Sequence, residues 1–486
     1  VPTPGSVSPV PADTAAYRNN LDADLLGIDL LNLGLPLDLE FGTGVYSEYA
    51  RAGTLPGPGV PPNQAARQHG ASGLITDNGA VNLDAASSPN PPRTGTLRLG
   101  DLPALGGVLA GLVTDLDLEI GAVASDAKLD GCQALWSGGM DAVQRRYLVS
   151  DLDLVLDSPL ISGFSDDGVG LLDSLAVALE STLDGALTLI GTLVNQVVLD
   201  GIASLLAGPG IDIGLLSIAV NAAPAAVDID LNLTGVVAQL TQRRTVDGVT
   251  LDLGTGEIRI DLAALLGAIY EDSNGLNGRA PNTYVLSESV VNAVLERVET
   301  ILVQIVDEID DGLLAALYDS TVTVSTAAAL NTCVLVVLCG DIVGVDINIE
   351  TALGSLVGYP GYPVPIVDAE AKALTILSGL DVLISDIVNL LTGSLGGLVG
   401  ATLPTVLGPA LNAAILPAAT GLISATVSSL FGLVTSLVTA LEPVLMLVAE
   451  ILPIQLNYQV DAPATPRAPD LDEARSYSVS ALRVGV

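Results

Sequence analysis

The sequence predicts an α+β protein in which antiparallel sheets have long aliphatic helices inserted between their strands. Two observations lead to this fold class. Acidic and aliphatic residues alternate at 115–118 and 151–154, as they do in strands with one buried and one hydrated face. Elsewhere leucine, valine and isoleucine recur at helical spacing over 171–194 and 291–309, which is typical of one buried helix face. The two stripes consist of Leu171, Leu172, Leu175, Leu179, Leu183, Leu187, Ile190 and Val194, and of Val291, Val294, Leu295, Val298, Ile301, Leu302, Ile305 and Ile309.

After residue 146 the same order of elements, strand–helix–strand–strand, recurs three times. The first pass comprises a strand at 148–156, helices over 169–206 and strands at 211–221 and 227–233. The second comprises a hairpin of 249–253 and 258–262 around the turn 254–256, a helix over 288–318 capped by Ser287, and strands at 321–325 and 345–350. The third starts near Ala369, continues through a helical apolar block and closes with strands at 454–460 and 477–484.

These patterns divide the chain into five consecutive parts. Residues 1–16 form a Pro-rich N-terminal arm, and 17–146 form a β-rich N-terminal region of short strands and loops. Three α+β units follow at 147–245, 246–358 and 359–486, the last with the apolar helical block. The first residues, which are rich in proline and include neither Met nor a basic segment, lead us to expect a mature terminus after signal removal.

The composition limits the partners of the chain. Seventeen basic residues against fifty-five acidic ones give a formal charge of −38, so we expect the surface to repel nucleic acid. Half of the residues are hydrophobic but only 3% are aromatic, so the core must be built from aliphatic side chains. Mean hydropathy is high, and nearly every charge must therefore lie outside.

The helical block contains no charged residue from 387 to 441. Uncharged stretches of this length can cross a membrane, but Gly, Pro, Ser, Thr and Asn interrupt this one every few residues. We favour buried core helices, with a subunit interface second and a membrane insert last.

Nothing in the sequence indicates an enzyme. The single histidine, His69, lies in a predicted loop, so a nucleophilic triad would depend on that one residue. Zinc is disfavoured for the same reason, and a hydrolase with paired carboxylates ranks low because the chain has a single tryptophan for sugar stacking. We therefore expect no catalytic residues and no cofactor.

Calcium is the one cation that the sequence leaves open, since it needs only oxygen ligands. The best local candidates are Asp272 and Asn274, in the loop 271–278. The loop does not fit an EF-hand, because Leu276 stands where a ligand is required. An ordinary Asn/Gly turn is the favoured alternative.

Three cysteines, Cys132, Cys333 and Cys339, allow at most one intramolecular disulfide. In one extended strand, Cys333 and Cys339 would lie roughly 20 Å apart at about 3.3 Å per residue. They can therefore pair only if the segment between them turns back, and buried reduced thiols are the alternative.

Residues 46–52 (YSEYARA) and 70–81 (GASGLITDNGAV) resemble the choice-of-anchor G family of secreted actinobacterial surface proteins, and so does 277–286 (NGRAPNTYVL). The resemblance covers most of the chain, but these motifs are structural. It implies export and attachment to the cell envelope. This chain ends without the sorting signal of that family, which leaves assembly with other copies as an alternative to covalent anchoring.

We therefore expect a secreted, non-catalytic structural protein of the cell surface that self-assembles into a filament or surface layer. Its main partner would be a second copy of itself, with the cell envelope or a host or environmental surface as further partners. The alternative is a monomeric, calcium-dependent adhesin or ligand-binding module that uses the acidic strand faces.

Overall fold

The structure is a computed structural model that describes residues 21–29, 39–41, 45–52, 67–76, 79–80, 95–98, 112–121, 123–130, 143–207, 217–334, 338–374, 381–461 and 477–485. The fold is mixed α+β with antiparallel sheets, as the sequence predicts. The chain divides into two compact units: unit 1 contains 1–165, 242–302 and 434–486, and unit 2 contains 166–241 and 303–433.

The units are assembled from segments that are not consecutive, unlike the five parts expected from the sequence. The expected boundaries after residues 146 and 245 fall inside strands β9 (Val143–Val149) and β13 (Arg243–Val246). Each of the three passes along the chain supplies strands to both units. The expected arm, 1–16, lies outside the described residues.

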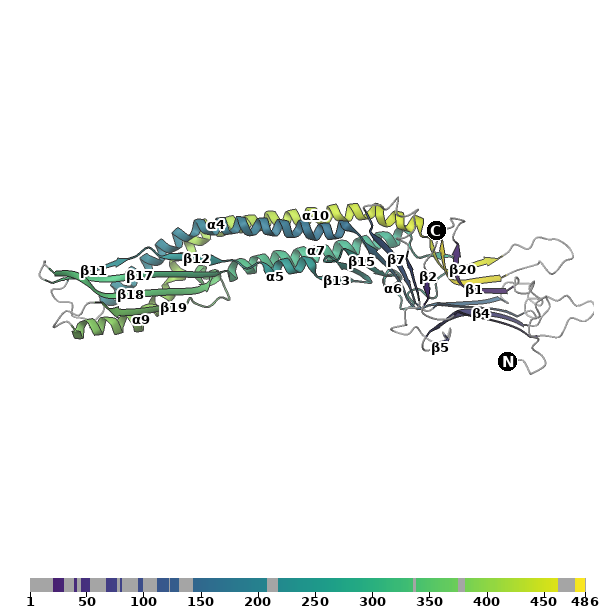
Figure 1. Cartoon of the computed structure of the whole chain (residues 1–486), viewed down its shortest axis with the longest axis horizontal. Coiled ribbons are helices and arrows are strands. Elements are labelled where there is room, and N and C mark those ends of the chain that lie inside the picture. Colours follow the sequence, from purple (N-terminus) through teal and green to yellow (C-terminus); the bar gives the residue numbers. More distant parts are fainter. Residues whose placement is uncertain are drawn as a thin grey trace, which may run out of the picture. The chain divides into compact units, whose positions relative to one another are not determined.

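A seven-stranded antiparallel sheet is the largest sheet of unit 1 (Figure 1). Its strand order is β13-β14-β15-β10-β7-β6-β2. Besides β13, the sheet contains β2 (Leu39–Phe41), β6 (Gly95–Arg98), β7 (Asp115–Ile120), β10 (Leu152–Asp157), β14 (Val249–Asp252) and β15 (Glu257–Asp261). The β14–β15 hairpin confirms the predicted one, and Gly256 in its turn has the positive φ of +84° that favours glycine.

Two smaller sheets complete the strands of unit 1. One has the order β3-β4-β8-β9, with β5 paired to β4, and the other has the order β1-β21-β20-β16. Strands β1 and β21 run parallel, an exception to the expected antiparallel pairing. The bounds are β1 (Leu21–Asp29), β3 (Val45–Ala52), β4 (Arg67–Thr76), β5 (Gly79–Ala80), β8 (Val123–Asp130), β16 (Thr283–Tyr284), β20 (Ile454–Asp461) and β21 (Tyr477–Gly485).

The chain crosses twice between two of these sheets at a shared corner. Strand β7 passes through Gly121 into β8, and β9 passes through Ser150 and Asp151 into β10. The Gly121 N–H donates to the Asp151 carbonyl at 2.9 Å, and a β-carbon on Gly121 would lie 2.6 Å from that of Asp151. The prediction of one strand over 148–156 was therefore wrong, because Ser150 and Asp151 form a corner between two strands that belong to different sheets.

His69 also differs from its expected place in a loop. It lies within β4, where its register partners are Ala50 of β3 and Lys128 of β8. Gly70 and Gly73, which follow His69, are both paired in the ladder. The backbone pairing of β4 with two neighbours outweighs its weak strand propensity.

Unit 2 contains a five-stranded antiparallel sheet of order β11-β17-β18-β19, and β12 also pairs with β17 (Figure 1). Its strands are β11 (Ser217–Ala222), β12 (Ala226–Asp230), β17 (Thr321–Val334), β18 (Leu338–Ala352) and β19 (Val367–Ala373). Strands β17 and β18 are far longer than the predicted 321–325 and 345–350, since β17 continues to Val334 and β18 begins at Leu338. Residues 335–337 lie outside the described part of the chain.

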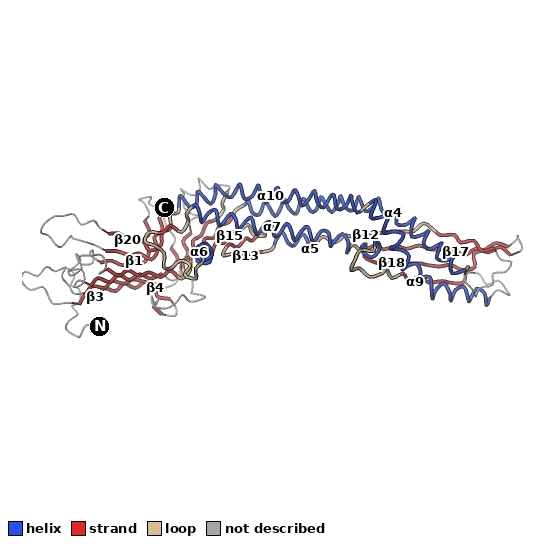
Figure 2. The backbone as a smooth tube through the Cα atoms, turned by 180° about the vertical axis from the view of Figure 1, so that it is seen from behind, coloured by secondary structure: helices blue, strands red, loops and turns tan. Residues whose placement is uncertain are grey.

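The helices are aliphatic and several are long (Figure 2). They are α4 (Pro159–Leu206), α5 (Thr234–Val237), the 3-10 helix η3 (Ala238–Thr241), α6 (Leu262–Tyr270), α7 (Glu288–Asp319), α8 (Leu353–Val357), α9 (Asp381–Ala414) and α10 (Leu416–Ile451). Every residue of the stripe predicted on α7 is buried, and so is the α4 stripe except for the half-buried Leu171 and Leu187. The aliphatic core is thereby confirmed at both helices.

Helix α9 of unit 2 packs against the backbone before and within β19 (Figure 1). Its buried stripe repeats every three or four residues from Ile384 to Leu411. Glycines take the places of closest approach: a β-carbon on Gly396 would lie 2.5 Å from the carbonyl oxygen of Val367. The absence of side chains at such positions lets the helix lie directly on the strand.

Candidate functional site

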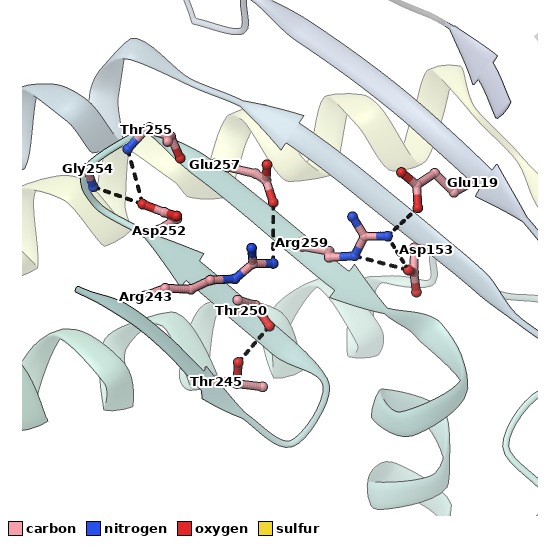
Figure 3. A network of polar contacts seen from close by, with 10 residues as sticks. All are labelled: Glu119, Asp153, Arg243, Thr245, Thr250, Asp252, Gly254, Thr255, Glu257 and Arg259. Carbon is pink, nitrogen blue, oxygen red and sulfur yellow. Dashed lines mark hydrogen bonds and ion pairs between the residues drawn. The ribbon is translucent and has the colours of Figure 1, made fainter. Parts of the chain in front are cut away.

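The seven-stranded sheet of unit 1 carries a row of directly opposed carboxylates. Asp252, Glu257, Asp157 and Asp115 are register partners in the successive strands β14, β15, β10 and β7. Arg243 is the partner of Asp252 at one end, and its guanidinium lies 3.6 Å from Glu257 (Figure 3). Like charges directly opposite each other destabilise a sheet, so this acidic row is an electrostatic cost to the fold.

The cost is visible at Asp157. Partial burial raises the pKa of this carboxyl above its ordinary value, and the negative charges of Glu257 and Asp115 raise it further. The ionised form of Asp157 is therefore disfavoured in the folded protein.

A second acidic row on the same sheet has an arginine paired with two of its three carboxylates. Asp261, Asp153 and Glu119 are partners across β15, β10 and β7. The Arg259 guanidinium lies 2.6 Å from Asp153 and also pairs with Glu119 (Figure 3). Burial alone would lower the pKa of Arg259, but its hydrogen bonds to both carboxylates outweigh burial and raise it.

The role of Arg259 was missed in the sequence. A signal was present, because Ile258-Arg259-Ile260 places a cation on the hydrated side of an alternating strand in a very acidic chain. Which carboxylates it meets depends on strand order, and strand order is not encoded in alternation.

Three carboxylates of unit 1, those of Asp151, Asp153 and Asp261, have oxygens within 4.8 Å of one another. Two of them already have other roles. Asp153 is buried against Arg259, and Asp261 accepts the Ala264 N–H at 2.8 Å as the N-cap of α6. A hard cation at this triad would have to share these oxygens with the arginine and the helix cap.

The predicted calcium candidates lie directly after α6. Both oxygens of Asp272 accept hydrogen bonds from Arg279, each at 2.9 Å, and Asp272 also accepts the Asn274 N–H at 3.0 Å. These bonds hold the pKa of Asp272 below its ordinary value, with the Arg279 side chain as the main cause. Asp272 and Asn274 thus share one turn, in which both carboxylate oxygens of Asp272 are bonded to the Arg279 guanidinium.

The segment around Arg279 also ties this turn to a neighbouring strand. The side-chain amide of Asn277 donates to the Val149 carbonyl and accepts from the Val149 N–H, both at 2.9 Å. The Asn277 amide thereby makes the same two bonds to Val149 of β9 that the backbone of a neighbouring strand would make. Tyr147 adds a bond from its hydroxyl to the Leu276 carbonyl at 2.9 Å. This part of the 277–286 motif is accordingly structural.

The sheet of unit 2 spaces its acidic residues differently. Thr323 of β17 separates Asp228 of β12 from Glu350 of β18. Between β18 and β19, two acidic residues stand directly opposite each other at one position, where Asp346 is the partner of Glu370. Lys372 lies 3.3 Å from both of these carboxylates. Acidic alternation is here compatible with a stable, hydrated face and requires no bound cation.

The exposed residues of α9 and α10 between 387 and 433 carry no charge, and together we call them the uncharged helical face. They are mostly Gly, Ala, Ser and Thr, with the larger Val406 40% exposed and Phe431 36% exposed. The exposed side of α4 is the opposite case, since it carries Asp166, Asp173 and Asp184.

Two serine hydroxyls of this face donate to carbonyls of their own helix. Ser428 donates to the Ser424 carbonyl at 2.7 Å and Ser429 to the Ala425 carbonyl at 2.9 Å. Because their donors are already satisfied, these side chains can leave water without losing a hydrogen bond. The uncharged helical face can therefore be covered at little polar cost.

Length and composition alone would allow α4, α9 and α10 to cross a membrane. In the most apolar window of α9 only 28% of the residues are buried inside the structure, and in that of α10 33% are. The block from 387 to 441 is thus neither wholly core nor wholly surface: one stripe is buried and the other side is open.

The fold and these surfaces define a mixed α+β protein of antiparallel sheets and long aliphatic helices, with an acidic exterior and one uncharged helical face. The chain belongs to the family described as a domain of unknown function, DUF8394, whose model matches residues 3–486. A search of curated proteins and a search of solved structures each found no match. The resemblance to the choice-of-anchor G family stays a prediction.

Proposed function

We propose that the protein is a secreted, non-catalytic structural protein of the cell surface that self-assembles into an extracellular filament or surface layer. The observation that carries the proposal is the uncharged helical face. Copies with a net charge of −38 repel each other, so they meet at least cost through a surface that has no charge. Small side chains on that surface also let two helices approach closely.

The surroundings of α9 favour a second copy over a membrane as the occupant. Helix α9 packs on β19, whose exposed residues include Asp368 and Glu370. Insertion of the helix would bring these carboxylates toward the lipid, at a cost of about 2.5–3.5 kcal/mol for each charge that reaches the bilayer centre. A protein surface can leave the same residues in water.

The experiment adds charge to the proposed interface. Ser424 and Ser428 are exposed and lie one turn apart on α10. We expect the full-length wild-type protein to form polymers in sedimentation velocity and negative-stain microscopy. The double variant S424E/S428E should remain monomeric, because the new carboxylates would face those of the neighbouring copy.

A matched control places two glutamates on an exposed side that is already acidic. Ser174 and Ser181 of α4 are exposed, and the variant S174E/S181E should polymerise like the wild type. Circular dichroism of both variants checks that the helices are retained. A wild-type protein that stays monomeric over the whole concentration range would refute the proposal, and flotation with liposomes would indicate a membrane surface instead.

A second candidate function is a monomeric, calcium-dependent adhesin, favoured by the acidic row and by the triad of Asp151, Asp153 and Asp261. Calcium between opposed carboxylates would relieve their repulsion. Isothermal titration of chelator-treated protein tests this function directly. The absence of both a binding heat and a rise in Tm on adding calcium would rule it out.

A further inference from the structure

The two cysteines closest in sequence, Cys333 and Cys339, become direct partners in the sheet of unit 2. The chain turns back between β17 and β18, and the register pairs Cys333 with Cys339. This is the condition that the sequence left open. Opposite residues of an antiparallel ladder have α-carbons about 4.5 or 5.5 Å apart and project from the same face. Both separations fall within the range of about 4.4–6.8 Å that disulfides span.

An irregularity in the ladder produces this alignment. From Thr321 to Leu330 the register is constant, and it would have placed Cys333 opposite Gly340. It shifts between Leu330 and Asn331, so that Ile342 is the extra residue of β18 and Cys333 meets Cys339. Without this bulge the cysteines would be offset by one residue and would project from opposite faces.

Side chains next to the cysteines already converge across the same two strands. Asn331 and Asp341 form the first pair beyond the bulge, two positions from the cysteines and on the same face. The Asn331 amide donates to the Asp341 carboxylate at 3.2 Å. The two strands thus bring facing side chains into contact at this end of the hairpin.

The end of the hairpin is supported by the rest of the sheet on the β17 side, where β11 pairs with β17 as far as Cys333. On the β18 side the ladder with β19 stops at Val343 and Ala373, and the Leu374 N–H still donates to the Ile342 carbonyl at 2.9 Å. Beyond Ile342 the described residues of β18 pair only with β17. Strand ends held on one side open more readily than central ladders. A covalent link there would hold the register beyond the bulge.

We propose that Cys333 and Cys339 form a disulfide bond that closes the β17–β18 hairpin. As the S–S bond forms, the two thiols together lose two electrons and two protons. A small-molecule disulfide takes these up by thiol–disulfide exchange and is reduced to two thiols. Such a bond persists outside the reducing cytosol. The proposal does not depend on self-assembly, because a monomer can carry the same bond.

The test counts thiols in the full-length protein after exposure to a glutathione buffer of extracellular redox poise. The protein is denatured, alkylated without reductant, digested and analysed by mass spectrometry. We expect the peptide or linked peptides with Cys333 and Cys339 to be unalkylated and lighter by two hydrogen atoms, with Cys132 alkylated. Reductant before alkylation should yield three alkylated cysteines.

Single substitutions separate this pairing from its alternatives. C132S should leave no alkylated cysteine, whereas C333S should leave Cys339 open to alkylation. Alkylation of Cys333 and Cys339 in the oxidised wild-type protein would overturn the proposal. A bond from Cys132 to either of the other two would overturn it as well, and both results are readable whether or not the protein polymerises.

Discussion

Gly400 of α9 and Pro365, which precedes β19, approach so closely that a β-carbon on Gly400 would lie 2.5 Å from the Pro365 carbonyl oxygen. No real side chain tolerates that distance, so the helix and the strand pack through backbone. Helix α9 is thereby fixed on the sheet by its glycines as well as by its aliphatic stripe. The uncharged helical face depends on this contact, because the side of α9 that packs on the sheet determines which side of the helix stays exposed.

The first prediction concerns this contact. G400A should lower the free energy of unfolding by about 1–3 kcal/mol, because the methyl group forces the helix away from the Pro365 carbonyl. Urea denaturation measures the change. Gly397 is the control: among the described residues, no atom lies within 4 Å of the position that its β-carbon would take, so G397A should stabilise by up to about 1 kcal/mol. Equal effects of the two substitutions would contradict the close packing.

The second prediction concerns the arginine of the acidic sheet. R259A removes the cation that pairs with Glu119 and with Asp153, whose side chain is 7% exposed. The expected loss is about 3–5 kcal/mol of unfolding free energy, as for other broken buried pairs. R243A removes a cation that is half exposed and 3.6 Å from Glu257, so it should cost at most about 1 kcal/mol. Chemical denaturation of both variants compares them, and a harmless R259A would show that the network is not needed.

The third prediction concerns pH and the acidic row. Burial and the charges of Glu257 and Asp115 raise the pKa of Asp157, so the folded protein binds the proton more tightly than the unfolded chain. The stability contributed by this proton is present at low pH and is lost as pH rises through the raised folded pKa. D157N should therefore raise the Tm at pH 7, and the gain should shrink as the solution is acidified. A lower Tm for D157N at neutral pH would contradict this electrostatic interpretation.

The fourth prediction has the opposite sign. The hydrogen bonds from Arg279 lower the pKa of Asp272, so its contribution to stability is present at neutral pH and is lost as pH falls through the lowered folded pKa. D272N should lower the Tm at pH 7 and should have a smaller effect near pH 3, below the ordinary aspartate pKa of about 3.9. The neighbouring E271Q is a control for loss of one negative charge. Identical pH dependence of the two variants would show that the ion pair has no role.

Elements whose pattern is local could be predicted from the sequence. The apolar stripe of α7 and the β14–β15 hairpin depend on spacing and turn residues within one segment, and both are confirmed. Helix α7 also begins at Glu288 as expected, with the Ser287 carbonyl accepting the N–H groups of Val290 and Val291. In these segments local propensity and burial favour the same structure.

The corner at Gly121 and Asp151 could not be predicted in the same way. Sequence pattern gives the face of each side chain but not the sheet to which a strand belongs, so two strands separated by only two residues were taken as one. The same limit applied to Asp272, whose partner Arg279 lies only seven residues away but reaches it through a turn. Contacts that depend on where the chain bends cannot be predicted from the spacing of residues along the sequence.

The side-chain amide of Asn277 has a consequence for how copies of the protein can join. It occupies both the N–H and the carbonyl of Val149, the two groups through which an incoming strand would bind at this position. Val149 is therefore closed to a donor segment from a neighbouring molecule. Strand addition at Val149 would first have to break both bonds, so an asparagine in a loop protects this part of the β9 edge against edge-to-edge aggregation.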